Sequence, residues 1–317
     1  MSTQEYSGTM PENTFMSVEE GRKFYDLSER DSLFASPLDQ ALVERGIARV
    51  ALSVTDSDFE SFLDAYAECI DAYPKLLQET SHAVDSRYAF TAGHVRKEKK
   101  IDPITGAQTN DPKSLIHFNE KATLRWQEQF TAANSPLAFR QFLAMGADLQ
   151  LELAATGRAI YGELEETHPN IQKAFFPIEN DKPVSFGFLR GVIYDGYAVS
   201  EASSALVAKP HTDVSGGTLH GYTDKPGFMA LINGEWIAVD TEPGFGYFFV
   251  GDGHEKLYGE NCRIKAVEHR VDRITPLDAD YIGPRRTVVN FNNTPYIDYA
   301  NSLQDTAPQA VSREQAA

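Results

Sequence analysis

From residue 183 onward the sequence is a succession of short β-rich runs, separated by turns that contain Gly, Pro or Asp. Val, Ile, Phe, Tyr and Thr are frequent in these runs, and such residues favour strands. The runs recur at roughly 8–12 residues, a spacing typical of a β-sandwich or a barrel. They are SFGFLRGVIY, SALVAKPHTD, GTLHGYT, GFMALI, EWIAVD, GYFFVG, CRIKAVEHRV and RTVVNFN.

The preceding part of the chain has mostly helical periodicity. Short helices are expected at 16–29 and 36–46, a strand at 48–54, and longer helices at 119–134 and 136–165. Another helix follows residue 55, where Phe59, Phe62, Leu63, Tyr66 and Ile70 recur on one face after polar capping residues. The stretch KKIDPITGAQTNDPKS, with its Pro and Gly residues, is predicted to be a loop.

The order of helices first and strands afterwards predicts an α+β protein, mainly β with N-terminal helices. No linker separates the two parts, so we expect a single domain over residues 16–301. Its mostly helical part would cover 16–182 and its β core 183–301. The polar ends, 1–15 and 302–317, are predicted to be flexible tails.

Composition excludes several classes of function. The net charge of −17 disfavours nucleic acid and anionic membrane surfaces as partners, because both are bound through Lys and Arg. Two cysteines form neither a zinc motif nor a disulfide framework, and the polar N-terminus does not resemble a secretion signal. We therefore expect a cytoplasmic protein with a small-molecule substrate and no obligate protein partner.

One motif suggests a metal site. Residues i and i+2 of an extended strand point to the same side, so His211 and Asp213 can converge on one ion. Two histidines and one carboxylate form the facial triad of mononuclear iron(II) enzymes. The spacing alone leaves the second histidine open among His220, His254 and His269.

The surrounding sequence resembles the isopenicillin N synthase-like group of iron(II)/2-oxoglutarate-dependent oxygenases. An ordered string of motifs over residues 187–293 carries this resemblance, and DPKSLIHF (111–118) weakly resembles a segment of the family's N-terminal region. The string comprises His211-Thr212-Asp213, Thr218-Leu219, Pro226-Gly227-Phe228, Gly234-Glu235-Trp236, Pro243-Gly244, Gly251-Asp252 and His269-Arg270-Val271.

The resemblance implies a double-stranded β-helix, a jelly-roll variant, in which His211, Asp213 and His269 bind Fe(II). It also implies 2-oxoglutarate and O2 as cosubstrates, with ascorbate as a candidate stimulant. His220 is then interpreted as a bystander. Because Asp213 supplies the carboxylate that related halogenases lack, halogenation is disfavoured.

The far carboxylate of 2-oxoglutarate requires a cation, and the family places an Arg-x-Ser on its last core strand. Arg285 and Thr287 match this pattern, but a one-residue slip in register would present Arg286 instead. The gap of sixteen positions after His269 is longer than the family's, which suggests a longer hairpin. Tyr194 is a further candidate cosubstrate ligand, and Arg190 a candidate substrate ligand.

These residues predict a dioxygenase that oxidises an unactivated C–H bond of a small molecule, such as an amino acid or a secondary metabolite. The outcome would be hydroxylation, desaturation or oxidative cyclisation, with release of succinate and CO2. Two alternatives remain. One is an iron enzyme of the same fold that does not use 2-oxoglutarate, and the other is a non-catalytic jelly-roll binding module.

Overall fold

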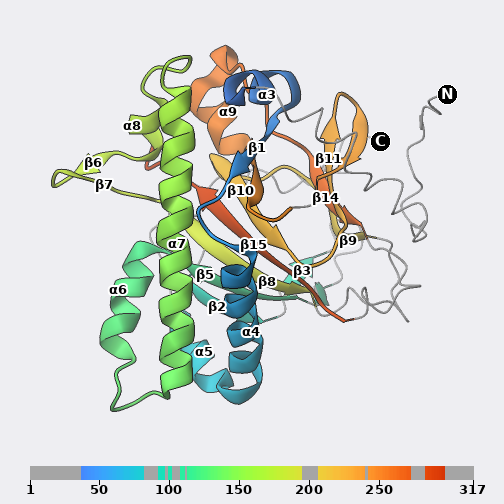
Figure 1. The fold of residues 1–317 in the computed structure, drawn as a ribbon. Coiled ribbons are helices and arrows are strands. Elements are labelled where there is room, and N and C mark those ends of the chain that lie inside the picture. The colour runs from blue at the N-terminus through green and yellow to red at the C-terminus, as the bar shows by residue number, and fades with distance from the viewer. Residues whose placement is uncertain are drawn as a thin grey trace, which may run out of the picture.

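The computed structural model describes residues 37–81, 92–96, 99–101, 108–110, 113–194, 206–239, 242–272 and 283–296. Its centre is a pair of antiparallel sheets (Figure 1). The larger sheet has seven strands in the order β1 (Ile47–Ala51), β13 (Phe245–Val250), β10 (Gly217–Thr223), β15 (Arg285–Asn292), β8 (Phe188–Tyr194), β5 (Lys113–Phe118) and β2 (Gly93–Arg96). The smaller sheet has four, in the order β12 (Glu235–Ala238), β11 (Phe228–Ile232), β14 (His269–Asp272) and β9 (Leu206–His211).

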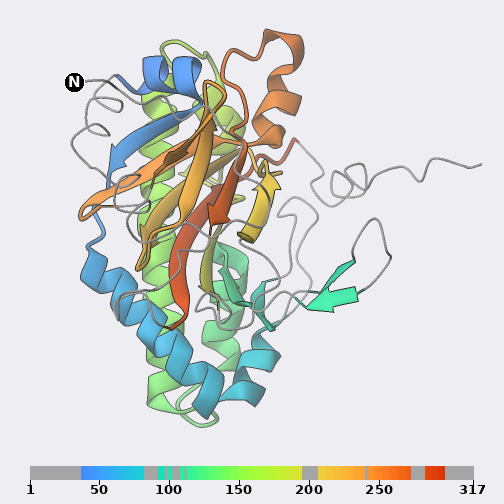
Figure 2. The same cartoon turned by 90° about the vertical axis from the view of Figure 1, so that its right-hand side faces the viewer.

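Helices cover the outer face of the larger sheet. Figure 1 shows the longest helix, α7, next to α4, and Figure 2 shows the strands lying in front of α7. The remaining helices are shorter. The bounds of the described helices, α7 included, are α3 (Leu38–Arg45), α4 (Asp56–Ala72), α5 (Pro74–Thr80), α6 (Glu120–Gln129), α7 (Leu137–Leu164), α8 (Ile171–Phe175), α9 (Asp252–Tyr258) and the 3-10 turn η2 (Gly259–Asn261).

Local sequence explains why the two main helices form and why they pack closely. Thr55 and Asp58 form a capping box at the start of α4, in which each side chain accepts a hydrogen bond from the other's backbone N–H. Along α7, Gly146 faces the ring of Phe118 on β5, and a Cβ atom there would lie 2.2 Å from that ring. The missing side chain lets α7 approach the sheet, which buries both elements.

Alternation along the strands divides the apolar side chains between two cores. Leu219, Phe248 and Val288 of the larger sheet pack against the helices in the main cluster. Their neighbours Tyr247 and Phe249 point the other way and pack between the sheets, with residues of β11 and β14. The space between the sheets therefore contains an apolar cluster, and Phe228, Phe249 and Val271 of this cluster also line the candidate site.

Most of the predicted elements are present. The helices expected at 36–46, after residue 55, at 119–134 and at 136–165 correspond to α3, α4, α6 and α7, and the strand at 48–54 corresponds to β1. The expected antiparallel β architecture with several helices is confirmed. The predicted helix at 16–29 and the two predicted tails lie outside the described residues.

Three predictions were wrong in detail. The stretch expected to be a loop contains the hairpin strands β3 (Lys99–Ile101) and β4 (Gln108–Asn110) and the start of β5. The segment between the expected strands GYFFVG and CRIKAVEHRV, for which no helix was expected, contains helix α9, and only the end of CRIKAVEHRV is a strand. Besides the expected β1, the part predicted to be mostly helical also contributes β2 and β5 to the larger sheet. A further two-stranded ribbon joins β6 (Ile178–Glu179) to β7 (Lys182–Pro183).

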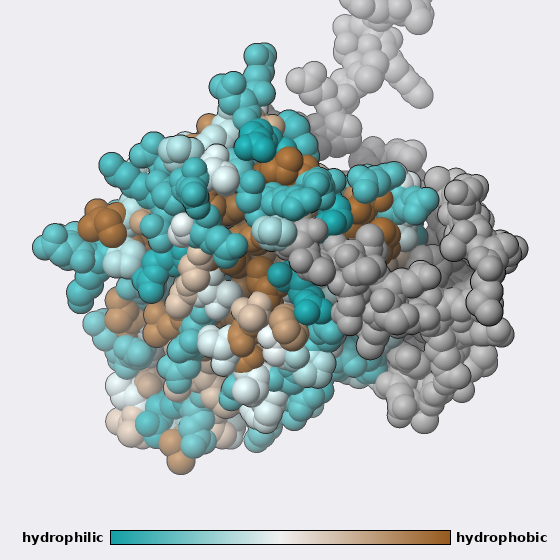
Figure 3. Space-filling view, turned by 45° about the horizontal axis from the view of Figure 1, so that its top comes forward, coloured by the Kyte–Doolittle hydropathy of each residue, from teal (hydrophilic) through white to brown (hydrophobic). Residues whose placement is uncertain are grey.

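The surface fits the high net charge. Figure 3 shows a largely hydrophilic face on which hydrophobic side chains occur in small groups. Among the described residues, no helix combines the length and apolar character that crossing a bilayer requires.

Candidate metal centre and cosubstrate pocket

The smaller sheet brings His211, Asp213 and His269 together. His211 ends β9 and His269 begins β14, and these two residues are cross-strand partners. Asp213 follows two residues after His211. Its Oδ1 lies 3.9 Å from Nε2 of His211 and 3.8 Å from Nε2 of His269. One potential ligand atom from each residue lies within 4.8 Å of the others, and the described residues contain no other such cluster.

Both imidazole rings are held with Nε2 facing the carboxylate. Nδ1 of His211 lies 2.7 Å from the carbonyl oxygen of Lys209, and Nδ1 of His269 lies 3.0 Å from that of Val267. A carbonyl can only accept, so each Nδ1 carries the proton and donates it. Each Nε2 is then left with a lone pair, the state that binds a metal.

The carboxylate is fixed in a similar way. Thr218 donates its hydroxyl to Oδ2 of Asp213, which leaves Oδ1 toward the histidines. The backbone is also fixed, because Asp252 N–H donates to the Asp213 carbonyl at 2.8 Å. A Cβ at Gly251 would lie 2.4 Å from that same oxygen, so only glycine fits beside it.

The two histidines differ in exposure. His269 is buried, with its ring centroid 4.9 Å from that of Phe249 and 5.5 Å from that of Phe228. The His211 side chain is 48% exposed. The centre is therefore closed on the side of the apolar core and open on the side of β9, the edge strand of the smaller sheet.

Arg285 reaches the same cavity from β15. Its side chain is fully buried, and its Nε donates to the carbonyl oxygen of Lys225 at 3.1 Å. No group of the described residues forms a hydrogen bond with its terminal nitrogens, Nη1 and Nη2. A buried guanidinium with two vacant donors is costly unless an anion accepts from them. The terminal donors fit a carboxylate, because their planar arrangement matches its two oxygens.

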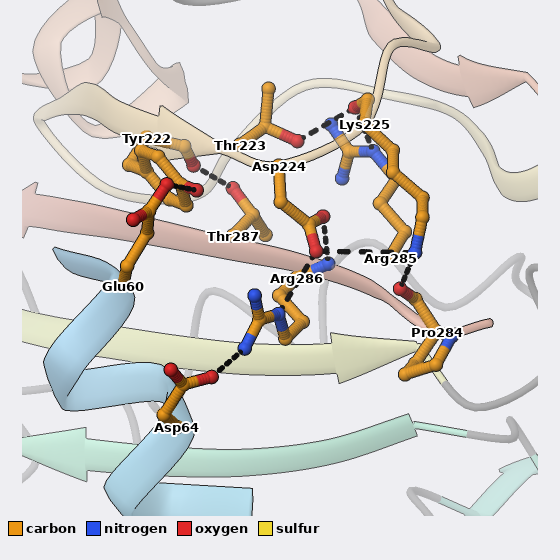
Figure 4. A network of polar contacts seen from close by, with 10 residues as sticks. All are labelled: Glu60, Asp64, Tyr222, Thr223, Asp224, Lys225, Pro284, Arg285, Arg286 and Thr287. Atoms are coloured by element: carbon orange, nitrogen blue, oxygen red, sulfur yellow. Dashed lines mark hydrogen bonds and ion pairs between the residues drawn. The ribbon is translucent and has the colours of Figure 1, made fainter. Parts of the chain in front are cut away.

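Arg286, the alternative in the sequence, points to the opposite face of β15. Its Nε donates to Asp224 at 2.9 Å, and its Nη1 pairs with Asp64 of α4 (Figure 4). Asp224 Oδ1 also accepts from the backbone N–H of Arg286. These ion pairs hold the start of β15 in place, and they leave Arg285 as the arginine that faces the cavity.

Thr287 and Tyr194 flank Arg285 as expected from alternation. Tyr194 is the cross-strand partner of Arg285, and its ring centroid lies 5.7 Å from the guanidinium carbon. Thr287 donates its hydroxyl to the carbonyl of Tyr222 at 2.6 Å. Both residues line the cavity.

His220 also lines the cavity, although sequence reasoning set it aside. Its ring stacks on Phe228, with centroids 4.5 Å apart, and its Nε2 lies 3.3 Å from the Thr287 hydroxyl. Burial, followed by the nearby Arg285 and His269, holds the pKa of His220 well below its usual value. The ring is therefore neutral and adds no charge. His254 lies elsewhere, buried in α9 against Phe175.

Arg190 faces the cavity from β8, and the structure adds Lys113 of β5 to its lining and His117 of β5 as a partner of Arg190, both of which sequence reasoning missed. Lys113 lines the cavity and is the cross-strand partner of Tyr194. His117 is the partner of Arg190 and accepts a hydrogen bond from its Nε at 2.9 Å. The alternation of Lys113, Leu115 and His117 is visible in the sequence, but it could not be connected with the site without knowing that β5 pairs with β8.

No protein-family model matches this chain, and no curated protein sequence matches it. Solved structures do. A full-length Neurospora crassa protein in complex with α-KG aligns with a TM-score of 0.60 at 14% identity, over 89% of this chain and 85% of that chain. Dioxygenase for auxin oxidation 1 from Arabidopsis thaliana, a 2-oxoglutarate complex, aligns with a TM-score of 0.59 at 15% identity, over 89% and 93%.

A third structure, JOX2 in complex with 2OG, Fe and JA, aligns with a TM-score of 0.57 at 17% identity, over 89% of this chain and 75% of that chain. At these identities the likeness concerns the path of the backbone. The chain therefore has the fold of the iron- and 2-oxoglutarate-dependent oxygenases of known structure.

Proposed function

We propose that this protein is a non-haem iron(II)- and 2-oxoglutarate-dependent dioxygenase with a small-molecule substrate, built on a double-stranded β-helix. The observation that carries the proposal is the pairing of two half-sites in one cavity. One is the triad of His211, Asp213 and His269, and the other is the buried guanidinium of Arg285 with two vacant donors. The shared fold with oxygenases that bind these groups supports the same conclusion.

The donor set suits iron(II). Two imidazoles and one carboxylate are the facial-triad donor set of mononuclear iron(II) enzymes, and they would leave coordination positions for other ligands. When bound, iron(II) and 2-oxoglutarate supply the oxidising chemistry, in which O2 is consumed and succinate and CO2 are released as a C–H bond is oxidised. The protein binds and orients these groups and excludes water from the pocket.

Each residue of this chain then has a defined task. Thr218 and the carbonyls of Lys209 and Val267 orient the three ligands. Arg285 holds the far carboxylate of 2-oxoglutarate, with Thr287 and Tyr194 beside it. The apolar side chains between these ends, such as Val289, limit access of water to the pocket.

The vacant donors of Arg285 also favour this function over its alternatives. A same-fold iron enzyme that does not use 2-oxoglutarate would need a substrate carboxylate at the open donors of Arg285, whereas 2-oxoglutarate supplies that carboxylate itself. A non-catalytic binding module needs neither the arginine nor a triad whose three side chains are each oriented by a hydrogen bond.

The direct test is anaerobic addition of iron(II) and 2-oxoglutarate to the pure protein. We expect a visible charge-transfer band, and then succinate formation and oxygen uptake when air is admitted. His211→Ala and His269→Ala should remove both signals, because each deletes a ligand. A band that persists in both variants would contradict the ligand assignment. Iron binding with no response to 2-oxoglutarate would favour the iron enzyme that does not use it.

A further inference from the structure

An irregularity in β10 brings a polar ring into the cavity. The pairing of β10 with β15 shifts between His220 and Tyr222, which leaves Gly221 as an extra residue. In a regular strand residues two apart share a face, but a β-bulge re-aims the side chains beside it. His220 accordingly lines the cavity and stacks on Phe228 of the smaller sheet. Tyr222 points toward the helices instead and stacks on Phe59 of α4.

Hydrogen bonding determines which nitrogen of His220 carries a proton. Thr287 donates its one hydroxyl proton to the main-chain carbonyl of Tyr222 at 2.6 Å, because a carbonyl can only accept (Figure 4). The Thr287 oxygen is therefore the acceptor in its 3.3 Å contact with Nε2 of His220. Burial, followed by the nearby Arg285 and His269, holds the pKa of His220 well below its usual value. The ring is neutral, and its single proton lies on Nε2.

The segment that follows the bulge connects this contact with the cosubstrate arginine. Arg285 and Thr287 lie on the same face of β15, and both donate to main-chain carbonyls of residues 222–225. The Thr287 hydroxyl binds the carbonyl of Tyr222 at one end of the segment. Nε of Arg285 binds the carbonyl of Lys225 at the other end, at 3.1 Å. The direction of the Arg285 guanidinium thus depends on how the whole segment lies on β15.

We propose that His220 is a positioning residue for 2-oxoglutarate, which acts through Thr287 on the segment that orients Arg285. Its N–H fixes the Thr287 oxygen as an acceptor and directs the Thr287 proton to the bulge carbonyl. Because that proton is engaged by the protein, the far carboxylate of 2-oxoglutarate is held by Arg285 rather than by the Thr287 hydroxyl. This inference rests on the proposed function, since it assigns Arg285 to 2-oxoglutarate.

Three substitutions of His220 test the role of its N–H group. Glutamine places an amide N–H near the position of Nε2, asparagine places one near Nδ1, and phenylalanine keeps an aromatic ring without any N–H. We expect His220→Phe and His220→Asn to raise the dissociation constant for 2-oxoglutarate by about three- to tenfold, as the loss of one neutral hydrogen bond predicts. His220→Gln should retain most of the wild-type affinity.

Calorimetric titration of 2-oxoglutarate into anaerobic, iron(II)-loaded protein measures these constants. Wild-type affinity in His220→Phe would overturn the proposal. A loss in His220→Gln as large as that in His220→Phe would also overturn it, because the shape of the ring and not its N–H would then matter. Iron(II) affinity should change much less than 2-oxoglutarate affinity in all three variants, since the three metal ligands are intact.

A double-mutant cycle tests whether the effect passes through Thr287. Thr287→Val removes the hydroxyl at nearly constant volume and should weaken 2-oxoglutarate binding at least as much as His220→Phe. If the two residues act as one unit, adding His220→Phe to Thr287→Val should cause little further loss. Multiplication of the two single effects in the double variant would contradict the route through Thr287.

Glu60→Gln is the control for a general disturbance of the bulge. Glu60 of α4 accepts a hydrogen bond from the Tyr222 hydroxyl at 3.1 Å, on the helix side of the sheet (Figure 4). Its substitution weakens this contact without altering a residue of the cavity, so 2-oxoglutarate affinity should stay at the wild-type value. A loss equal to that of His220→Phe would refute a specific role of His220.

The outcomes separate this inference from the proposed function. A wild-type protein that forms no charge-transfer band with iron(II) and 2-oxoglutarate fails the proposed function. A wild-type protein that forms the band, with His220 variants that bind 2-oxoglutarate equally well, retains the proposed function and loses the role of His220. If His220→Phe does not fold, as far-ultraviolet circular dichroism would show, the comparison of His220→Gln with His220→Asn still decides.

Discussion

Arg285 donates its Nε–H to the main-chain carbonyl of Lys225, and within the part of the chain that the structure describes its two terminal nitrogens have no hydrogen-bond partner. One bond therefore fixes the direction of the guanidinium while leaving its fork open. The turn that carries Lys225 is itself tied to β15, because the Lys225 ammonium donates to the carbonyl of Pro284 (Figure 4). Arg285 is thus positioned by a backbone carbonyl of a turn that is itself tied to the start of β15.

Replacing Arg285 tests its assignment to 2-oxoglutarate. Arg285→Gln should raise the dissociation constant for 2-oxoglutarate by at least about tenfold, because a hydrogen bond to a charged group contributes about 1.5–3 kcal/mol. Metal affinity should be unchanged, since the triad is intact. Calorimetric titration of 2-oxoglutarate into metal-loaded protein measures the effect.

Arg286→Gln is the matched control for that experiment. It removes the neighbouring guanidinium from the opposite face of β15, where its partners are Asp224 and Asp64. It should lower stability with a much smaller effect on 2-oxoglutarate affinity. If the larger loss of affinity occurred in Arg286→Gln, the register read for β15 would be wrong.

Asp224 is expected to position Arg285 from a distance. Its carboxylate accepts from both the backbone N–H and the Nε of Arg286, and its own N–H donates to the Arg286 carbonyl. Asp224→Asn keeps the shape but weakens these charge-assisted bonds, at a cost of about 1–3 kcal/mol in the free energy of unfolding. We expect a lower Tm together with a raised KM for 2-oxoglutarate.

Asp64→Asn separates the two effects of Asp224→Asn. Asp64 pairs with the same arginine, but its side chain is 70% exposed. Exposed ion pairs contribute about 0–1 kcal/mol, so this variant should leave both Tm and KM nearly unchanged. An equal rise in KM for the two variants would rule out the special role of Asp224.

Thr218 should control metal affinity without being a ligand. Thr218→Val removes the hydroxyl that orients Asp213 and should weaken iron(II) binding by about 10- to 100-fold. Thr218→Ser keeps the hydroxyl and should retain affinity. Ser215→Ala tests a residue whose hydroxyl contacts Thr218 but not Asp213, and it should have the smaller effect. Titration of the apoprotein with a divalent metal gives the three constants.

Alternation of side chains explains how much of the site the sequence could predict. His211 and Asp213 share a face two residues apart, and Arg285 and Thr287 do so on β15. Local spacing suggested the first pair, and the resemblance to the oxygenase family supported it and suggested the second pair. The choice between Arg285 and Arg286 depended on register, which only the pairing of β15 with β8 fixes.

Long-range pairing explains what the sequence could not predict. Lys113 lines the cavity, and His117 contacts Arg190, because β5, from the N-terminal part of the chain, pairs with β8. His220 was set aside for a related reason, since its stacking on Phe228 joins two different sheets. Helix α9 was missed because Gly251 and Gly253 indicate a turn, whereas Gly251 is required by its contact with Asp213.

The burial of His254 makes the stability of the protein depend on pH. His254 is buried in α9, and desolvation, with a smaller effect of His168, lowers its pKa to about 4 from the usual 6.5. Between about pH 4 and pH 6.5, His254 is therefore protonated in the unfolded chain but not in the folded protein. Stability is full above about pH 6.5 and falls as the pH drops toward 4, by up to about 3 kcal/mol.

Chemical unfolding of the metal-free protein between pH 7 and pH 4 measures this loss, and His254→Phe isolates the contribution of one ring. Phenylalanine keeps the stacking on Phe175 but cannot titrate. The variant should lose less stability on acidification than the wild type, because the unfolded chain gains one proton fewer. The carboxylates change the free energy of unfolding equally in both proteins, so their contribution cancels when the two pH profiles are subtracted. If the two pH profiles were parallel, His254 would be protonated in the folded state or exposed, and its burial against Phe175 would be refuted.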